Sequence, residues 1–400
     1  MPTTRCDVVI VGGGIVGLAT ARALAESGEK VVVVEAEQRI ATHQTGHNSG
    51  VIHSGLYYAA GSAKAKGCRE GADALYKYCE ERGIRHERCG KLVLATEPNQ
   101  LAALDELERR GVTNGLEGVK HLGADELSEY EPHVTGVAGL WVPQTGLVDF
   151  VEVAHAYASD VREKDGQVRT NESFVDAERA DGGTVVTTTA GEVVADVLVN
   201  CGGLHADRIA TRCGVDPLVR IVPFRGEYYE LLPQHRGLVR NLVYPVPDPA
   251  LPFLGVHITR HIDGTVSAGP NAVLALSRGH YGRFAFSPRD FFGTITYPGF
   301  WRLLRGYWRT GASEWMRSMM KRSFIAAAQR LVPELEPSHV QRAGCGLRAL
   351  ALQRDGTLVH DFRIVEAEGQ VHVLNAPSPA ATASLHIGTQ IARIATRQHA

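Results

Sequence analysis

The stretch that most constrains the fold lies within the first forty residues. It reads DVVIVGGGIVGLATARALAESGEKVVVVEAE and begins at Asp7. The apolar and Ala-rich runs predict a buried strand over Val8–Val11, a helix over Ile15–Ser27 and a second buried strand over Lys30–Val34. A strand, a helix and a strand in this order form a βαβ unit, which places the two strands parallel in one sheet.

Three glycines of this unit form a GxGxxG motif. Gly12 permits a tight turn, Gly14 lets the backbone approach a pyrophosphate, and Gly17 lets the helix pack closely on the strand. The start of the helix adds unpaired N–H groups and partial positive charge. Glu35 ends the second strand, where an acidic side chain binds the hydroxyl groups of an unphosphorylated ribose. The motif therefore predicts a site for NAD or FAD.

A polar, Gly-rich loop follows, HQTGHNSGVIHSGLYY from His43 to Tyr58. A nicotinamide enzyme would usually continue with further βαβ units, so this loop favours FAD. The sequence here resembles flavoprotein oxidases of the D-amino-acid oxidase and glycine oxidase superfamily, in which the loop runs along the pyrophosphate and ribityl chain toward the isoalloxazine. The resemblance implies noncovalent FAD. Covalent attachment through His43 or His53 is the alternative.

Longer segments narrow the resemblance. PFRGEYYEL (223–231), YPVPDPALPFLGVHITRHIDGTVSAGPNAVLA (244–275) and NAPSPAATAS (375–384), together with the His43 loop, are similar to the L-2-hydroxyglutarate oxidase and dehydrogenase family, in the same order along nearly the whole chain. This family oxidises L-2-hydroxyglutarate, or a closely related 2-hydroxy acid, to 2-oxoglutarate by hydride transfer from C2 to flavin N5. Electrons then pass to quinone or O2.

Two other functions stay open from the sequence. The first keeps the fold but changes the donor to an amine, as in glycine or sarcosine oxidation. The second is a noncatalytic flavin-binding or membrane-adaptor protein. A substrate arginine and a full set of flavin contacts argue against the second function.

The resemblance implies an α/β fold with a Rossmann-like FAD-binding domain and an inserted α+β substrate domain on a mixed sheet. Apolar runs at 193–203 and 370–378 are expected to extend the nucleotide-binding sheet. Short β-branched or aromatic runs predict the mixed sheet at 89–96, 139–143, 226–232 and 253–260. The FAD-binding domain is expected over 1–88, 150–220 and 340–400, and the substrate domain over 89–149 and 221–339.

Composition excludes several classes of protein. A chain of 400 residues with 44% hydrophobic content suits two domains, and a formal charge of −2 gives no basic footprint for nucleic acid. The seven cysteines are scattered and never spaced CxxC, which argues against a disulfide framework and a structural zinc site. With no cleavable apolar leader, a cytoplasmic location is expected, with contact at the inner face of the cell membrane as an extension.

The resemblance also implies which residues line the cofactor. Val175 would contact adenine through its main chain, the small residues at 200–203 would allow close backbone approach, and those at 380–383 would begin a helix beside the flavin N1–C2=O group. The implied cofactor-lining residues are Gly12, Gly14, Ile15, Val16, Gly17, Glu35, Ala36, Thr45, His47, Asn48, Ser49, Val175, Cys201, Gly202, Gly203, Pro379, Ala380, Ala381 and Thr382.

Two arginines are candidates for binding a dicarboxylate substrate. Arg348 lies in AGCGLRALALQRDG, which resembles the GLRP segment of glycine oxidases, whose arginine holds the substrate carboxylate. The family usually reads GVRAQ here, so Leu350 stands where the family has a glutamine amide. If that amide contacts the substrate, the pocket for the distal carboxylate differs in this chain. Arg225 in PFRGEYY is the candidate for the second carboxylate, with an ion pair to Glu227 as the alternative.

The base that removes the hydroxyl proton is expected to be a histidine. His53 and His257 both lie in family-like motifs, and a pKa near 6.5 suits proton abstraction at neutral pH. His257 is slightly favoured, although a histidine on an apolar strand is often a buried core residue. Tyr57 is expected to line the substrate cavity.

A metal site is not expected. His43 and His47 have the i, i+4 spacing of metal ligands on a helix, but the intervening Thr45 and Gly46 favour a loop and no carboxylate lies nearby in sequence.

The segment 291–324 is unusual in composition. It contains three of the four tryptophans (301, 308, 315) and three of the four methionines (316, 319, 320), interspersed with arginines. Apolar residues recur at spacings of three, four and seven, as in an amphipathic helix. Its aromatic face either meets a lipid surface, with quinone as electron acceptor, or packs on the substrate domain or a second subunit, with O2 as acceptor.

Overall fold

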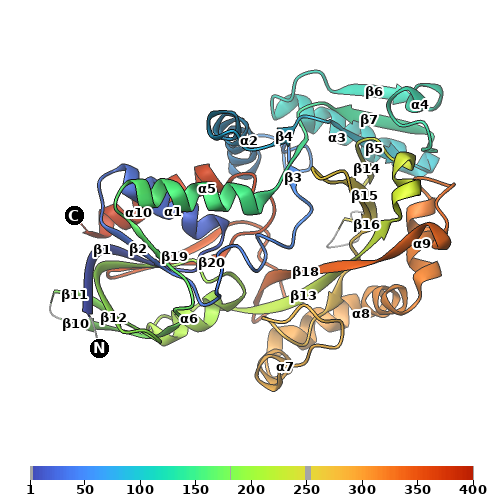
Figure 1. Cartoon of the computed structure of the whole chain (residues 1–400). Coiled ribbons are helices and arrows are strands. Elements are labelled where there is room, and N and C mark those ends of the chain that lie inside the picture. The colour runs from blue at the N-terminus through green and yellow to red at the C-terminus, as the bar shows by residue number, and fades with distance from the viewer. Residues whose placement is uncertain (1–2, 181, 248–253, 400) are drawn as a thin grey trace.

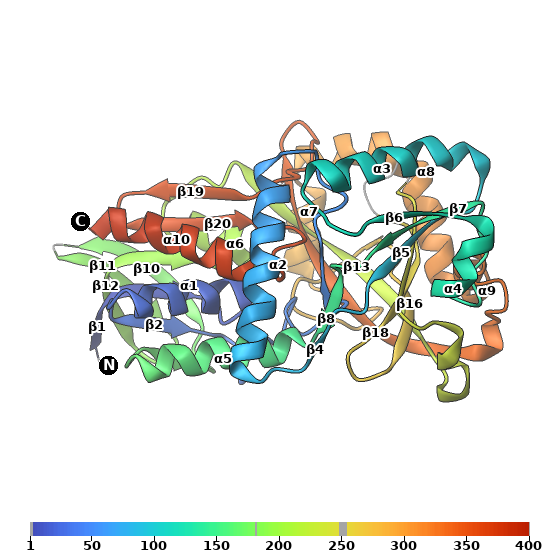
Figure 2. The same cartoon turned by 90° about the horizontal axis from the view of Figure 1, so that it is seen from above.

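A computed structural model describes residues 3–180, 182–247 and 254–399, which form two lobes side by side (Figure 1). The first lobe carries both termini at its far end, and the long helix α2 (Ala63–Arg82) runs between the lobes in the view of Figure 2. Each lobe is built on one large sheet. Within the described residues, sheets of eight, nine and three strands are formed.

The β1 sheet is the core of the first lobe. Its central strands are apolar and buried on both faces, as expected of parallel strands covered by helices. β1 pairs in parallel with β2 and β12, which confirms the expected βαβ unit. The order is β10 (Phe174–Ala180), β11 (Gly183–Thr188), β12 (Glu192–Asn200), β1 (Thr3–Val11), β2 (Val31–Val34) and β9 (Gln167–Arg169), with β20 (Gln370–Asn375) beside β12 and β19 (Arg363–Ala367) beside β20.

Three helices cover one face of this sheet. α1 (Ile15–Glu26) packs between α5 (Phe150–Glu163) and α10 (Ser384–His399), and buried side chains such as Leu24, Val153 and Ile391 fill the interface. A fully buried leucine or isoleucine of this kind contributes about 1.5–3 kcal/mol. Segments at the two ends of the chain are thus joined by one apolar core.

The β13 sheet is the core of the second lobe. Its order is β17 (Val273–Leu274), β13 (Val219–Leu231), β16 (Val266–Gly269), β15 (His257–Arg260), β14 (Leu242–Pro245), β5 (Lys91–Ala95), β7 (Ala138–Val142) and β6 (Lys120–Gly123), with β18 (Val340–Gln353) beside β13. The prediction assigned residues 340–353 to the FAD-binding domain, but they pair antiparallel with β13 from Val219↔Gln353 to Leu231↔Val340. The other domain boundaries stay predictions.

A small sheet and the remaining helices complete the two lobes. The small sheet contains β3 (Val51–Ile52), β8 (Gly146–Val148) and β4 (His86–Glu87). The helices are α3 (Leu101–Thr113), α4 (Leu127–Tyr130), α6 (Ala206–Arg212), α7 (Pro288–Ile295), α8 (Pro298–Met319) and α9 (Lys321–Gln329). The expected helical segment 291–324 is therefore shared by three helices, of which α7 and α8 lie along one side of the molecule below β13 and β18 (Figure 1). Among the described residues, no helix combines the length and the apolar content that a membrane crossing requires.

Candidate active site

A cavity of about 740 Å³ extends from the carboxyl end of β1 to the paired strands β13 and β18. Its walls come from segments far apart in sequence: the glycine turn after β1, the loop at 41–49, the turn after β12, and the stretch before α10. A cavity of this volume, at the carboxyl ends of parallel strands, has the size and place of a dinucleotide site.

The glycine turn fits a bound pyrophosphate. Gly12 has φ of +113°, which a side chain would strain, and a Cβ there would lie 2.5 Å from the Cys201 carbonyl oxygen. A Cβ on Gly17 would lie 2.1 Å from the carbonyl oxygen of Gly12. Glycine is therefore required at both positions, because the backbone of β1 approaches both α1 and the turn after β12.

The amino end of α1 faces the cavity with an electropositive first turn. Gly14 precedes the helix, and no acidic side chain lies in its first turn. Thr45 Oγ1 accepts a hydrogen bond of 3.0 Å from the N–H of Ile15. Glycine at the start of the helix leaves room for phosphate oxygens beside the remaining N–H groups.

Glu35 is held at the end of β2 by its own backbone surroundings. Its Oε2 accepts a hydrogen bond of 2.6 Å from the N–H of Gly13, and its Oε1 accepts one of 2.9 Å from the N–H of Glu37. A carboxylate oxygen accepts more than one hydrogen bond, so both oxygens can still receive ribose hydroxyl donors.

The loop that begins at His43 runs along the cavity without forming a helix. The ring of His47 stacks on Tyr281 with 3.9 Å between centroids, whereas His43 Nε2 lies 3.0 Å from Glu37 Oε1. Asn48 donates a hydrogen bond of 2.6 Å to the Thr45 carbonyl oxygen. Both histidine rings stack on Tyr281, and the loop lies between the glycine turn and β18.

The structure places every residue predicted to line the cofactor along this cavity, including Val175 and the run 379–382. Their contacts with FAD themselves stay a prediction. The cavity can hold FAD, because the glycine turn, the start of α1 and the acidic side chain of Glu35 all line it.

The opposite end of the cavity carries the polar groups for a substrate. Arg348, on β18, and His53, just after β3, both line it, and so does Tyr228 of β13. Burial lowers the pKa of His53 to about 3, and the nearby Lys91 and His257 add smaller contributions in the same direction. His53 is therefore a neutral imidazole at neutral pH.

His257 and Tyr57 do not line the cavity but lie behind it. The ring of His257 stacks on Tyr244 with centroids 4.1 Å apart, and its Nδ1 lies 3.0 Å from the Gly255 carbonyl oxygen. Burial also lowers the pKa of His257 to about 3. Because His53 lines the cavity and His257 does not, His53 rather than His257 is the better candidate for the base.

Arg225 occupies a different environment from the one expected of a substrate ligand. It does not line the cavity; its Nη2 lies 3.1 Å from Glu227 Oε1, and its Nη1 donates to the carbonyl oxygen of Arg283. Its guanidinium is thus bound to its own strand and a neighbouring loop. The structure gives no support to Arg225 as the ligand of a second carboxylate. Leu350 pairs with Val222 in the same ladder and does not line the cavity either.

Sequence reasoning missed Lys91, the first residue of β5. Its side chain is 1% exposed, and its Nζ lies 4.3 Å from the ring centroid of Tyr57 and 5.2 Å from that of Tyr244. Burial lowers its pKa to about 7. The sequence did carry a signal, since CGKLVLAT places one lysine in an otherwise apolar strand.

Arginines at the nucleotide end were also missed. Arg208, Arg212 and Arg289 line the cavity there, and Arg212 donates to the carbonyl oxygen of Val175. They come from α6 and α7, which are distant in sequence from the glycine motif. No local pattern distinguishes them from other surface arginines, so only the tertiary structure identifies them.

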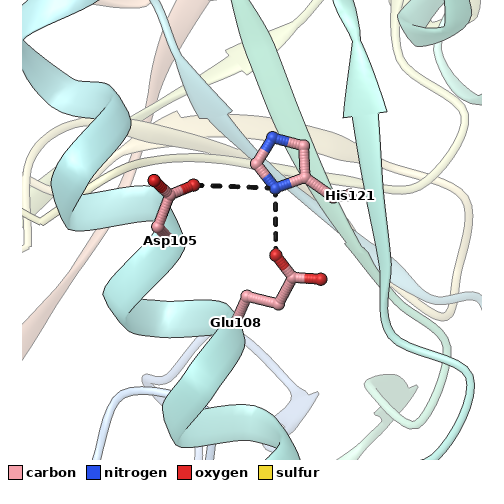
Figure 3. A group of neighbouring side chains, drawn as sticks. All are labelled: Asp105, Glu108 and His121. Atoms are coloured by element: carbon pink, nitrogen blue, oxygen red, sulfur yellow. Dashed lines mark hydrogen bonds and ion pairs between the residues drawn. The ribbon is translucent and has the colours of Figure 1, made fainter.

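A separate polar group lies outside the cavity. Figure 3 shows Asp105 and Glu108 of α3 pointing toward His121 of β6, whose Nδ1 lies 3.9 Å and 3.0 Å from their oxygens. A hydrogen bond between His121 and Glu108 accounts for this arrangement, which lies on the surface.

Comparison with known proteins agrees with this geometry. The profile of the FAD dependent oxidoreductase family, designated DAO, matches residues 7–394. L-2-hydroxyglutarate dehydrogenase of Indibacter alkaliphilus is 45% identical over 98% of this chain and 99% of its own length. The protein of the same name from Escherichia coli K12 is 42% identical over 96% of this chain and 92% of its own.

The fold is shared with more distant flavoproteins. The structure of L-alpha-glycerophosphate oxidase from Mycoplasma pneumoniae, with FAD bound, aligns with a TM-score of 0.79 at 24% identity, covering 100% of this chain and 95% of that one. The expected Rossmann-like fold with an inserted mixed-sheet domain, and the FAD cofactor, are thereby confirmed. This chain belongs to the family of FAD dependent oxidoreductases and, within it, groups with the relatives named L-2-hydroxyglutarate dehydrogenase.

Proposed function

We propose that this protein oxidises L-2-hydroxyglutarate, or a closely related 2-hydroxy acid, to the corresponding 2-oxo acid with FAD as cofactor. The observation that carries this proposal is the meeting of Arg348 and His53 at one end of a cavity whose other end is the glycine turn. This oxidation needs one group that binds the substrate carboxylate and one that accepts the hydroxyl proton, both at the flavin end of the cavity. The names of the relatives at 45% and 42% identity support the same substrate.

Arg348 binds the C1 carboxylate in this proposal. A guanidinium pairs with a carboxylate through two parallel hydrogen bonds, which fixes the orientation of the acid as well as its position. Arg348 lies opposite Phe224 in the β13–β18 ladder, so its backbone is rigid. The C2 carbon of the substrate is thereby oriented in the cavity.

His53 accepts the proton of the C2 hydroxyl group. Burial, with a smaller contribution from the nearby Lys91 ammonium group, keeps it neutral before substrate binds, so its ring has an acceptor nitrogen. An anionic substrate beside it offsets the positive charge of Lys91 and raises the pKa of His53, which favours proton transfer. Bound FAD supplies the acceptor for the two electrons that leave C2.

Anaerobic addition of substrates to the purified FAD-loaded protein tests this proposal. Bleaching of the visible absorbance by L-2-hydroxyglutarate, but not by its D-enantiomer, glycine or sarcosine, is the expected result. Bleaching by glycine or sarcosine alone would support the amine-oxidase alternative, and no bleaching by any acid or amine would refute the proposal.

We further propose that helix α8 docks on an anionic lipid surface and that quinone accepts the electrons. The side chains of Trp308 and Trp315 are 57% and 61% exposed, and Met316, Met319 and Met320 are exposed beside them. Solvent exposure of so many large apolar groups on one helix is unusual for a surface that meets only water.

Positive charge accompanies the exposed apolar groups. Arg305 and Arg309 are exposed on α8, and Arg322 follows at the start of α9. Aromatic side chains with interspersed arginines match the boundary between acyl chains and anionic headgroups. Apolar burial and charge complementarity thus both favour a lipid surface over a second protein.

Vesicle sedimentation tests the docking. The protein is expected to pellet with vesicles rich in phosphatidylglycerol and to stay in the supernatant with phosphatidylcholine vesicles, and the Trp308→Ala, Trp315→Ala double variant is expected to lose binding. Absence of binding, with self-association that the double variant abolishes, would instead identify a protein interface and favour O2 as the acceptor.

A further inference from the structure

We propose that Lys91 binds the second carboxylate of the substrate and so makes the site prefer dicarboxylic over monocarboxylic 2-hydroxy acids. This inference rests on the proposed function. It replaces Arg225, whose guanidinium is paired elsewhere, with a cation that sequence reasoning did not find.

The position of Lys91 is the first observation. It begins β5, which lies between β14 and β7 in the β13 sheet, and its side chain is 1% exposed. Its ammonium group lies 4.3 Å from the ring centroid of Tyr57 and 5.2 Å from that of Tyr244. Two electron-rich rings stabilise a cation there but do not neutralise its charge.

The charge surrounding Lys91 is the second observation. Among the described residues, no aspartate or glutamate pairs with it, and Cys68 is the acidic group whose influence on it is resolved. Its positive charge reaches both His53 and His257, and that of Arg348 also reaches His257. The substrate end therefore carries two cations, Lys91 and Arg348, which matches the two negative charges of a dicarboxylate.

An unpartnered hydroxyl is the third observation. Tyr57 Oη is buried and has no hydrogen-bond partner among the described residues, although its ring lies beside the Lys91 ammonium. A buried hydroxyl group without a partner is costly, so such a group commonly receives a ligand. The oxygens of a carboxylate bound to Lys91 would be acceptors for it.

A purely structural role does not account for this lysine. Burial without a counter-charge destabilises the charged form, and an apolar residue in β5 would pack without that cost. The lowered pKa of Lys91, about 7, has the same cause. Lys91 is next to the substrate end of the cavity, since its charge acts on His53, which lines that end.

The test compares two substrates in two variants of the FAD-loaded full chain. For Lys91→Met, kcat/KM is expected to fall by about 100-fold or more for L-2-hydroxyglutarate and by less than about threefold for L-2-hydroxyvalerate. Lys91→Arg is expected to retain the preference for the dicarboxylate. Lys77→Met is the control, since Lys77 is exposed and its ion pair with Glu81 lies on the surface.

Two readouts separate binding from folding. The dissociation constant of glutarate, measured from its perturbation of the visible spectrum, is expected to rise in Lys91→Met as much as kcat/KM falls. The melting temperature of the same variant is expected to rise, because a buried unpaired charge is removed.

The outcomes distinguish this inference from the proposed function. Suppose that the unmodified protein oxidises L-2-hydroxyglutarate. If Lys91→Met then lowers kcat/KM equally for both substrates, or for neither, the assignment of Lys91 is wrong and the proposed function stands. If the unmodified protein does not oxidise L-2-hydroxyglutarate, the proposed function itself fails.

Discussion

The main-chain N–H of His53 donates a hydrogen bond of 3.1 Å to Oγ1 of Thr382, 329 residues further along the chain. Thr382 Oγ1 also lies 3.3 Å from the carbonyl oxygen of Val51, to which it donates. One hydroxyl group thus fixes the segment before α10 against the loop that carries the proposed base. The position of His53 in the cavity depends on the carboxyl end of the chain.

Replacement of Gly17 by alanine is expected to abolish FAD binding. Its Cβ would lie 2.1 Å from the Gly12 carbonyl oxygen, so α1 and the glycine turn must move apart. We expect the variant to purify without visible absorbance, or to bind FAD at least about tenfold more weakly, a loss of about 1.4 kcal/mol. Gly306→Ala is the matched control, because a Cβ on that helical glycine meets open space. Equal flavin content in both variants would contradict the fit.

Removal of His53 is expected to slow reduction of the flavin far more than removal of His257. His53→Ala loses the proton acceptor, which is worth about 10²–10⁴ in rate. His257 lies behind the cavity, so His257→Ala should cost about tenfold or less, through repacking around Tyr244. Stopped-flow reduction under anaerobic conditions measures both, and the opposite ranking would make His257 the base.

Replacement of Arg348 by lysine is expected to slow the oxidation of both test substrates, because both carry a C1 carboxylate. A lysine keeps the charge but loses the paired hydrogen bonds, so kcat/KM should fall by about 100-fold, or about 2.7 kcal/mol, for L-2-hydroxyglutarate and L-2-hydroxyvalerate alike. This equal loss is the opposite of the selective loss expected at Lys91. Flavin content serves as the control for folding.

The pH dependence of kcat/KM follows from Lys91. The charged ammonium group, which is the form that binds a carboxylate, predominates below its pKa of about 7 and is lost as pH rises through that value. We therefore expect kcat/KM for the dicarboxylate to fall above pH 7. The groups that face Lys91 are the rings of Tyr57 and Tyr244, the imidazoles of His53 and His257, and the Cys68 thiol, which raises the pKa of Lys91 against the effect of burial.

The origin of this alkaline limb can be checked with a variant. In Lys91→Arg the limb should disappear from the accessible range, since an arginine stays charged. Persistence of the limb at the same pH in this variant would assign it to another group.

Arg278 is expected to be essential for stability rather than chemistry. It is almost fully buried, and it pairs with both oxygens of Asp207 at 2.6 Å and 3.0 Å and donates to the Leu204 carbonyl oxygen. Arg278→Met leaves a buried carboxylate without its partner, so the free energy of unfolding should fall by about 3–5 kcal/mol. Arg179→Met, which breaks an exposed pair with Glu368, should cost less than about 1 kcal/mol. Chemical denaturation compares the two.

Local pattern was sufficient for the βαβ unit of the first lobe. The predicted strand at Val8–Val11 extends to Thr3, and the predicted helix from Ile15 ends one residue early, at Glu26. Apolar runs and glycine spacing act over a few residues, and the backbone of a βαβ unit follows from them directly. Irregular family-like segments extended the same reasoning to the cofactor lining.

The interaction partners of individual side chains could not be predicted from the sequence in the same way. Arg225 and Arg348 stand in comparable motifs, yet Arg348 lines the cavity and Arg225 pairs with Glu227. Which face of a ladder each arginine occupies depends on the β13–β18 register, and that register is set by the whole sheet.

The amino-acid sequence by itself determined the βαβ unit and the glycine motif of the dinucleotide site, because each depends on residues a few positions apart, and it determined the kinship with flavin oxidases through continuous segments that can be compared without a structure. Only the tertiary structure decided that Arg225 is committed to Glu227, that His53 rather than His257 reaches the cavity, and that Lys91 is buried beside Tyr57 without a described acid to pair with. Those outcomes depend on the pairing of strands hundreds of residues apart, and burial and charge at a site arise only once that packing is complete.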